Sequence, residues 1–108
     1  MKIEIEIDEV QVWQTVFGSS PFSFGSWWTD CVYLYGSSWE KPGKVRLTAT
    51  DEITGEKTTK TISAEDLVRA LPAADKQTNI DMFNFEEYDS VAADALLQVA
   101  VFGKVIWG

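Results

Sequence analysis

Polar and apolar residues alternate along several stretches of the chain, and this period of two is typical of β-strands with one buried face. "KIEIEI" at 2–7 places isoleucines on one side and charged residues on the other, which predicts a half-buried edge strand. "KVRLTAT" at 44–50 and "KTTKTI" at 57–62 show the same alternation. Between them, Gly55 in "DEITGE" supplies the positive φ of a hairpin turn. The pattern predicts an antiparallel meander with one solvated face.

"WWTDCVYLY" at 27–35 predicts one more strand, because aromatic residues favour strands. Regular alternation divides this strand into two sides. One side holds Trp28, Asp30, Val32 and Leu34, and the other holds Trp27, Thr29, Cys31, Tyr33 and Tyr35. We expect Trp28, Val32 and Leu34 to belong to the core.

The other side of this strand has two interpretations. Tryptophan and tyrosine are common anchors of protein interfaces, which makes Trp27, Tyr33 and Tyr35 candidates for contact with a partner. The same residues would also fit beneath the loop "FGSSPFSFG" at 17–25 as buried structure. Trp39 lies in the turn "GSSWEKPG" and is the aromatic residue that we most expect to be exposed.

Apolar residues at helical spacing predict a short helix in "EVQVWQTVF" at 9–17. Asp8 would cap its first turn and Gly18 would end it. Its β-branched residues also permit a strand. As a helix, its core-facing stripe would be Val10, Trp13, Val16 and Phe17.

A second helix is predicted in "SAEDLVRAL" at 63–71. Ser63 would be its N-cap, and Asp66 three residues later completes a pattern close to a capping box. Pro72 would end this helix, because proline lacks the backbone N–H that continues one.

"VAADALLQVAVF" at 91–102 is the strongest helical pattern. Asp89 or Ser90 would cap it, and Gly103 stands where a left-handed residue ends a helix. Because the segment is apolar on nearly all sides, we expect it to be buried. "KVIW" at 104–107 is a last short strand.

The predicted order is strand, helix, three strands, two helices and a final strand. This order predicts an α+β fold in which two to three helices pack on one face of one antiparallel sheet of four to five strands. The length of 108 residues fits a single domain that spans 1–108.

The available side-chain chemistry is narrow. The chain has no histidine and one cysteine, which excludes histidine-dependent triads and ordinary zinc sites. Cys31, alone in an apolar strand, is more typical of a small buried residue than of a nucleophile. We therefore expect no catalytic residues, no metal site, no cofactor and no enzymatic activity.

Four acidic residues fall within nine positions: Asp81, Glu86, Glu87 and Asp89. They lack the spacing of an EF-hand calcium loop. Acids also gather before a helix because its N-terminus carries partial positive charge. A further use is imitation, in which carboxylates take the place of nucleic-acid phosphates on the surface of another protein. On that hypothesis these four acids are partner-binding residues.

Seventeen acidic residues against nine basic ones give a formal charge of −8. This balance repels nucleic acid and favours partners with basic surfaces, although solubility alone also explains it. Five cations lie near one predicted hairpin, but residues 41–60 net only +2, so we expect no direct nucleic-acid binding. The cations are Lys41, Lys44, Arg46, Lys57 and Lys60.

Location follows from what the sequence lacks. No apolar run approaches the roughly 18 residues of a membrane span, and the alternating N-terminus does not look like a signal peptide. A single cysteine suits a reducing compartment. We expect a cytoplasmic protein without a membrane partner.

Three segments carry a resemblance: "DALLQVAVFGKVIWG" at 94–108, "GSWW" at 25–28 and "TKTISAEDLVRAL" at 59–71. Together they resemble a family of small uncharacterised proteins from phages and mobile elements. Members typically end in an alanine-rich helix, an acid-flanked "LQ-A-FG" and a "VVYG" strand. Lys104 departs from the acid usual there, and Trp107 replaces a tyrosine.

The resemblance implies a phage or plasmid origin and no known enzymatic activity. Small acidic proteins of that origin often block host defence proteins such as CRISPR effectors or restriction enzymes. The expected function is therefore that of an anti-CRISPR type inhibitor that acts through its acids and exposed aromatics. The alternative is a structural or accessory phage protein that self-associates, for example as a homodimer, and an enzyme is the third hypothesis.

Overall fold

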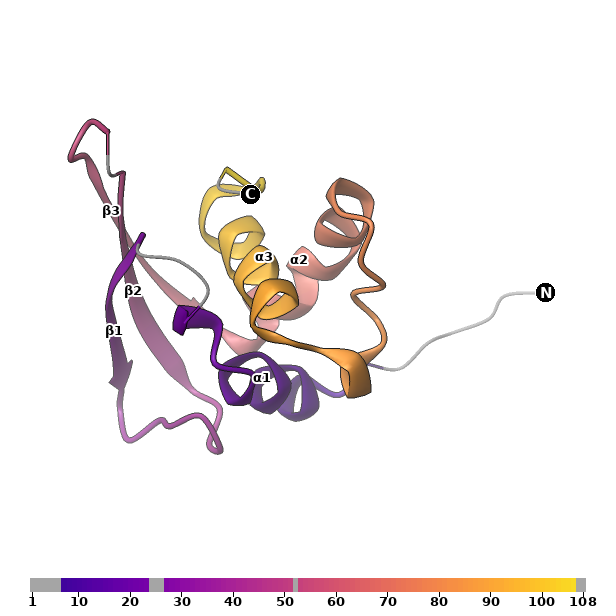
Figure 1. Cartoon of the computed structure of the whole chain (residues 1–108). Helices are drawn as coiled ribbons and strands as arrows, with labels where there is room; N and C mark the ends of the chain where they lie inside the picture. Colours follow the sequence, from indigo (N-terminus) through magenta and orange to yellow (C-terminus); the bar gives the residue numbers. More distant parts are fainter. Residues whose placement is uncertain (1–6, 24–26, 52, 107–108) are drawn as a thin grey trace.

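The computed structural model describes residues 7–23, 27–51 and 53–106. It is an α+β fold with three α-helices and one antiparallel sheet of three strands. The helices pack on one face of the sheet (Figure 1). In chain order, the elements are α1 (Glu9–Gly18), the 3₁₀ turn η1 (Pro21–Ser23), β1 (Trp28–Leu34), β2 (Lys44–Thr50), β3 (Lys57–Ser63), α2 (Ala64–Gln77), the 3₁₀ turn η2 (Phe85–Glu87) and α3 (Ser90–Phe102).

The sheet has three strands in order β1–β2–β3, not the four to five that the sequence predicts. The first predicted strand, at 2–7, lies outside the described residues except for Ile7. The last one is wrong over its described part, Lys104–Ile106. There the backbone N–H groups of Val105 and Ile106 donate to side-chain amides of Gln77 and Gln98 instead of to a strand.

A β-bulge at Thr29 overturns the predicted faces of β1. Trp28 pairs with Ala49 and Asp30 with Thr48, so Thr29 is one residue extra. Trp28 faces the helices as predicted, but beyond the bulge Cys31 and Tyr33 face them too. Val32 and Leu34, which we expected in the core, lie on the outer face opposite Arg46 and Lys44.

Strands β2 and β3 confirm the alternation. Val45, Leu47 and Ala49 are buried under the helices, whereas the intervening residues of β2 face outward. The turn before β3 contains Gly55 at φ 74°, as predicted. Every residue of β2 pairs with β3 in unbroken register, so β2 is the centre of the sheet.

Helix α1 begins at the predicted cap, where the Asp8 side chain accepts the N–H of Val10. Its buried residues are Val12, Trp13, Val16 and Phe17. Val10 was expected in this stripe but is 46% exposed, because the buried side of the helix is centred on Trp13 and Val16.

Helix α2 shows that a proline need not end a helix. Its capping box is confirmed, with Asp66 Oδ2 accepting from the N–H of Ser63 at 2.8 Å. The predicted end at Pro72 is wrong, since α2 continues to Gln77. Pro72 is exposed while Leu71 and Ala74 are fully buried, so burial of the second half outweighs the one missing hydrogen bond.

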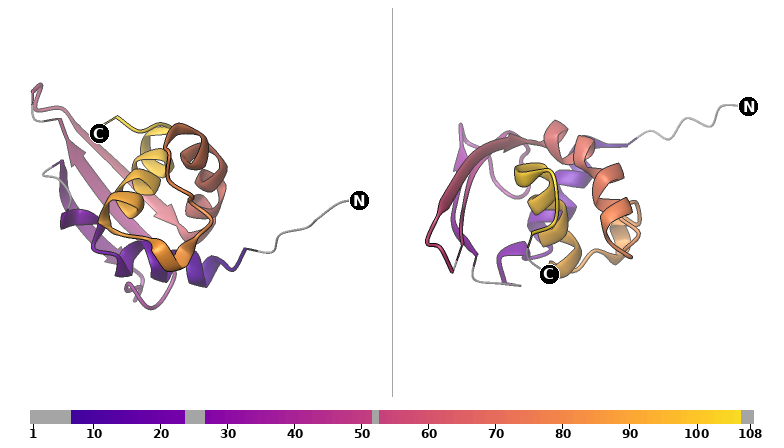
Figure 2. Two further views of the ribbon diagram at one scale, coloured as in Figure 1. Left: turned by 45° about the vertical axis from the view of Figure 1, so that its right-hand side comes forward. Right: turned by 90° about the horizontal axis from the view of Figure 1, so that it is seen from above.

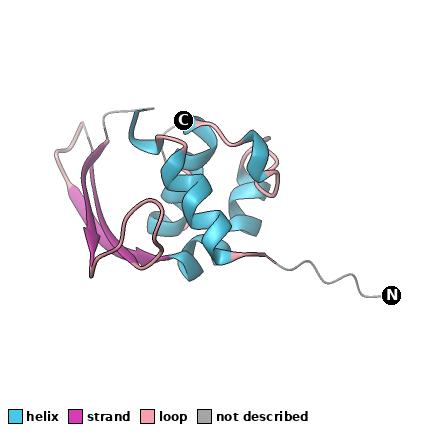
Figure 3. Ribbon diagram, turned by 90° about the horizontal axis from the view of Figure 1, so that it is seen from below, coloured by secondary structure: helices cyan, strands magenta, loops and turns pink. Residues whose placement is uncertain are grey.

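Helix α3 is the centre of the core, as its composition predicts. Asp89 caps it and Gly103 ends it at φ 78°. All ten residues from Ala92 to Val101 are buried. Figure 2 shows α3 between the sheet and α2, and Figure 3 shows the helices together on one side of the strands.

Candidate functional site

The most unusual group in the core is the carboxylate of Asp94, on α3. The residue is only 1% exposed. Oδ1 accepts the indole N–H of Trp28 at 2.6 Å and that of Trp27 at 2.9 Å. Oδ2 accepts from Gln98 Nε2 at 2.7 Å, one helical turn further on. The carboxylate therefore joins the start of β1 to the central helix.

Gln98 extends this network to the C-terminal segment. Its Oε1 accepts the backbone N–H of Ile106 at 2.8 Å. Within the described residues, no buried side-chain nitrogen or oxygen lacks a partner. The network thus satisfies each polar group that the fold buries here, as buried polar groups require.

Burial raises the pKa of Asp94, because a charged carboxylate is poorly solvated in the core. The hydrogen bonds from Trp27, Trp28 and Gln98 act in the opposite direction but do not cancel this effect. Both oxygens are occupied by N–H donors of the protein itself. We infer that the group holds the fold together and does not act on a ligand.

The sequence suggests no structural role for Asp94 beyond its place in "DALLQVAVFGKVIWG", one of the segments that carry the resemblance. Its partner Trp28 lies 66 positions earlier, so local patterns give no direct sign of the contact. The nearest signal was the resemblance itself, because "GSWW" and "DALLQ" supply Trp27, Trp28, Asp94 and Gln98.

The four predicted partner-binding acids are all exposed, and all lie between α2 and α3. Two of them also hold the local backbone: Asp81 accepts the N–H of Phe83, and Asp89 that of Ala92. Glu86 and Glu87 form the exposed turn η2. We call Asp81, Glu86, Glu87 and Asp89, together with the side chains between and beside them, the acidic end.

Exposed apolar side chains lie among these acids. Phe83 is 39% exposed and follows Asp81 by two residues, and Val91 is 38% exposed and follows Asp89 by two. Residues 77–103 contain five acids and no lysine or arginine. The exposed Asp8 and Glu9 begin α1, which contacts η2 (Figure 1). The acidic end therefore combines apolar contact area with negative charge.

The predicted aromatic partner residues divide into two pairs. Trp27 and Tyr33 are partly buried against the core, with the Tyr33 ring 5.8 Å from that of Phe17. Tyr35 is 88% exposed and Trp39 is 48% exposed, both in the connection from β1 to β2. This connection and η2 lie on either side of α1 in Figure 1. The structure thus places the exposed aromatics away from the acidic end.

The thiol and the acids show little sign of chemistry. Burial, with a smaller effect of Asp30, raises the pKa of Cys31 to about 11, so the thiol is protonated at neutral pH. In the described segments, no three histidine, cysteine or acidic side chains are grouped to hold a metal ion. The alternative use of the acids for a divalent cation therefore gains no support.

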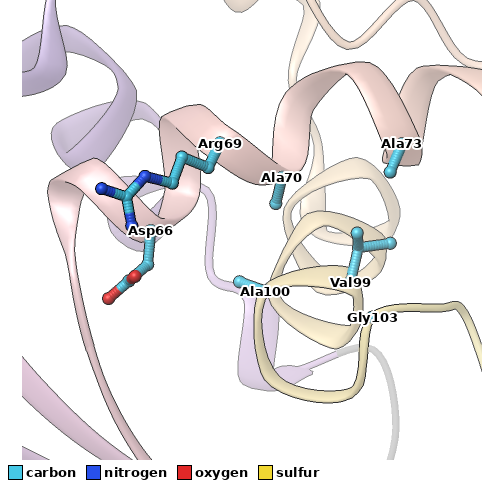
Figure 4. Close-up of a pocket in the computed structure, with 7 residues that line it drawn as sticks. All are labelled: Asp66, Arg69, Ala70, Ala73, Val99, Ala100 and Gly103. Carbon is cyan, nitrogen blue, oxygen red and sulfur yellow. The ribbon is translucent and has the colours of Figure 1, made fainter.

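A shallow hollow of about 280 Å³ lies between α2 and α3 (Figure 4). Its polar side chains are already engaged, since Arg69 pairs with Glu65 and Asp66 accepts from Ser63. The rest of its lining consists of Ala70, Ala73, Val99, Ala100 and Gly103. We assign it no chemistry.

None of the helices in the described ranges is long and apolar enough to cross a bilayer. Comparison of the chain with protein-family models, with curated proteins and with solved structures finds no match.

Proposed function

We propose that the chain is a non-enzymatic interaction protein whose acidic end binds and inhibits a host protein that handles nucleic acid. The observation that carries the proposal is the acidic end itself, where exposed Phe83 and Val91 lie among acids in a segment without any base. The resemblance to phage and mobile-element proteins supports a defence protein, such as a CRISPR effector or a restriction enzyme, as the target.

The anatomy of the acidic end is that of a binding surface. Protein interfaces generally have apolar residues at the centre and polar residues at the rim. Phe83 provides an aromatic anchor, and Asp81, Glu86 and Glu87 stand near it in the sequence. Carboxylates in these places would occupy positions that phosphates take on a basic surface. Such contacts speed association and are screened by salt.

The test is capture of host proteins by the tagged chain at low and at high salt, read by mass spectrometry. The variant combines Asp81→Asn, Glu86→Gln and Glu87→Gln, which removes three charges. Asp89 is left unchanged because it caps α3. The matched control, Asp30→Asn with Glu40→Gln and Glu56→Gln, removes three charges from the sheet and its turns, where all three residues are exposed.

We expect the wild type and the control to capture a nuclease or a CRISPR subunit at low salt. The variant should not capture it, and neither should the wild type at high salt. Purified target should then lose activity when the wild-type chain is added. Equal capture by the variant and the control would contradict a role for the acidic end.

Self-association is the second candidate function, and the sheet favours it. β1 and β3 each pair only with β2 among the described residues, so both outer edges remain available. An unpaired edge is a template for another strand. Sedimentation at high salt tests this alternative, because strand pairing between copies would persist where charge contacts are screened.

A further inference from the structure

No described helix or loop covers the outer face of the sheet (Figures 1 and 2). All three α-helices pack on the opposite face, and no other described element crosses it (Figures 1 and 2). Threonine hydroxyls on this face lie within hydrogen-bond distance of one another, with Thr48 Oγ1 and Thr59 Oγ1 3.0 Å apart. A solvated face rich in hydroxyl groups is therefore available to a ligand.

The outer face is positively charged although the chain is acidic. Lys44, Arg46 and Lys57 are exposed on it, and among the described strand residues Asp30 is its one acid. The net charge of residues 41–60 gives no reason to expect binding of nucleic acid. In the structure, however, the described cations of the outer face lie on the strands, apart from the acids of the turn. Asp51 lies in the β2–β3 turn, where its carboxylate accepts the N–H groups of Ile53 and Thr54. Among the described residues, the one ion pair joins Arg69 to Glu65, so no described acid forms an ion pair with these cations.

Tyr35 stands in the turn that follows β1, in a costly conformation. It has φ 54° and is followed by Gly36 at φ 75°, with Ser37 N–H donating to Leu34 at 3.0 Å, as in a type I′ turn. A bulky residue at positive φ is an outlier, since Asn and Gly favour this position. The fold nevertheless holds the tyrosine in solvent, directly after the residue that pairs with Lys44.

The connection that carries Tyr35 is fixed to α1. Trp13 Nε1 donates to the carbonyl of Ser38 at 2.7 Å, and Gln14 Nε2 donates to that of Glu40 at 2.8 Å. Tyr35 is therefore presented by a backbone held at both ends. Pre-organisation of this kind lowers the entropy that binding would cost.

We propose that the outer face binds single-stranded nucleic acid. Lys44 and Arg46 are two residues apart on one side of β2, so their Cα atoms are about 7 Å apart. This spacing suits neighbouring phosphates of an extended nucleic-acid strand. Threonine hydroxyls donate to phosphate and sugar oxygens, and Tyr35 stacks on a base. An acidic protein would also satisfy the cations, and tyrosine is a common anchor of protein interfaces. The tests below therefore include an acidic polymer that carries no bases. The proposal goes beyond binding by the acidic end and stands without it.

The first test is the fluorescence anisotropy of labelled oligo(dT) and oligo(U) with the purified chain at several salt concentrations. Three phosphate contacts predict a slope of about −2 for log K against log salt. Lys44→Glu with Arg46→Glu should weaken binding at least about tenfold and flatten this slope. The control, Lys76→Glu with Lys104→Glu, makes the same change in net charge at exposed sites off the face and should bind like the wild type.

The second test is Tyr35→Asn, which separates binding from folding. Asparagine tolerates the left-handed conformation, so thermal stability should be equal or higher. Loss of base stacking should weaken oligonucleotide binding about tenfold.

Three results would overturn the proposal: no binding of either oligonucleotide at low salt, equal loss in the control, or equally tight binding of poly-glutamate. The last would show that the face selects negative charge of any kind, as an acidic protein partner would require.

Discussion

Asp94 shows how one residue can determine the arrangement of segments far apart in the chain. A buried carboxylate is unfavourable unless hydrogen bonds compensate its lost hydration. Here two indole N–H groups and one amide N–H provide that compensation. Asp94→Ala would remove the acceptor of the buried Trp28 indole N–H, and loss of such a partner costs about 1–3 kcal/mol.

The raised pKa of Asp94 predicts a pH-dependent contribution to stability. The folded state holds the proton more tightly than the unfolded state, so this contribution decreases as the pH rises from the unfolded pKa through the folded one. Asp94→Asn has no such titration. Thermal unfolding at several pH values should therefore show that the stability of the variant relative to that of the wild type increases as the pH rises.

The control for this prediction is Glu87→Gln, since Glu87 is exposed on η2. It makes the same chemical change at the surface and so shows what the exchange of a carboxyl for an amide does to stability there. A difference between Asp94→Asn and the wild type that does not change with pH would show that the Asp94 carboxyl titrates as it does in the unfolded chain.

Cys31 should react slowly in the folded protein. Its pKa of about 11 leaves little thiolate at pH 8, and its side chain is partly buried. Iodoacetamide labelling followed by mass spectrometry should be much slower in the native chain than in urea, and it should accelerate as the pH rises. Rapid stoichiometric labelling of the native chain at neutral pH would contradict this.

At the scale of elements, local rules succeeded where the pattern was uninterrupted. "KVRLTAT" alternates without exception, and β2 has the predicted faces. The predicted faces of β1 are wrong beyond Thr29, because the composition of a strand does not show where a bulge lies. Helix α2 continues beyond its predicted end because burial of Leu71 and Ala74 stabilises it by more than the hydrogen bond missing at Pro72 destabilises it. The acidic end was predicted from acid spacing, whereas Phe83 and the Asp94 network needed three-dimensional contacts.

Pro72→Ala should stabilise the protein. The substitution restores one helical N–H donor and a residue of high helix propensity at an exposed position, for a gain of about 1 kcal/mol or more. Urea unfolding measures this gain. Pro42→Ala, outside any helix, is the control, and it should give no gain because it only loosens the unfolded chain.

At the scale of the molecule, α3 connects the other parts of the fold. It contacts α2, α1, η1 and β3, and its interior has no exposed side. Amide hydrogen exchange should therefore be slowest in α3, with opening free energies close to that of global unfolding. Residues 78–88, which contain one short 3₁₀ turn, should exchange faster than α3. Protection there equal to that of α3 would contradict this view.

The bulge at Thr29 has a consequence for insertions and deletions. Thr29 and Asp30 both point outward between the inward Trp28 and Cys31. A chain without Thr29 would alternate regularly and still present Trp28 to α3 and Cys31 to the helices. A one-residue gap should therefore be tolerated here, whereas a gap within β2 would turn its apolar side chains to solvent. When sequences of relatives are aligned, length differences in this strand belong at position 29.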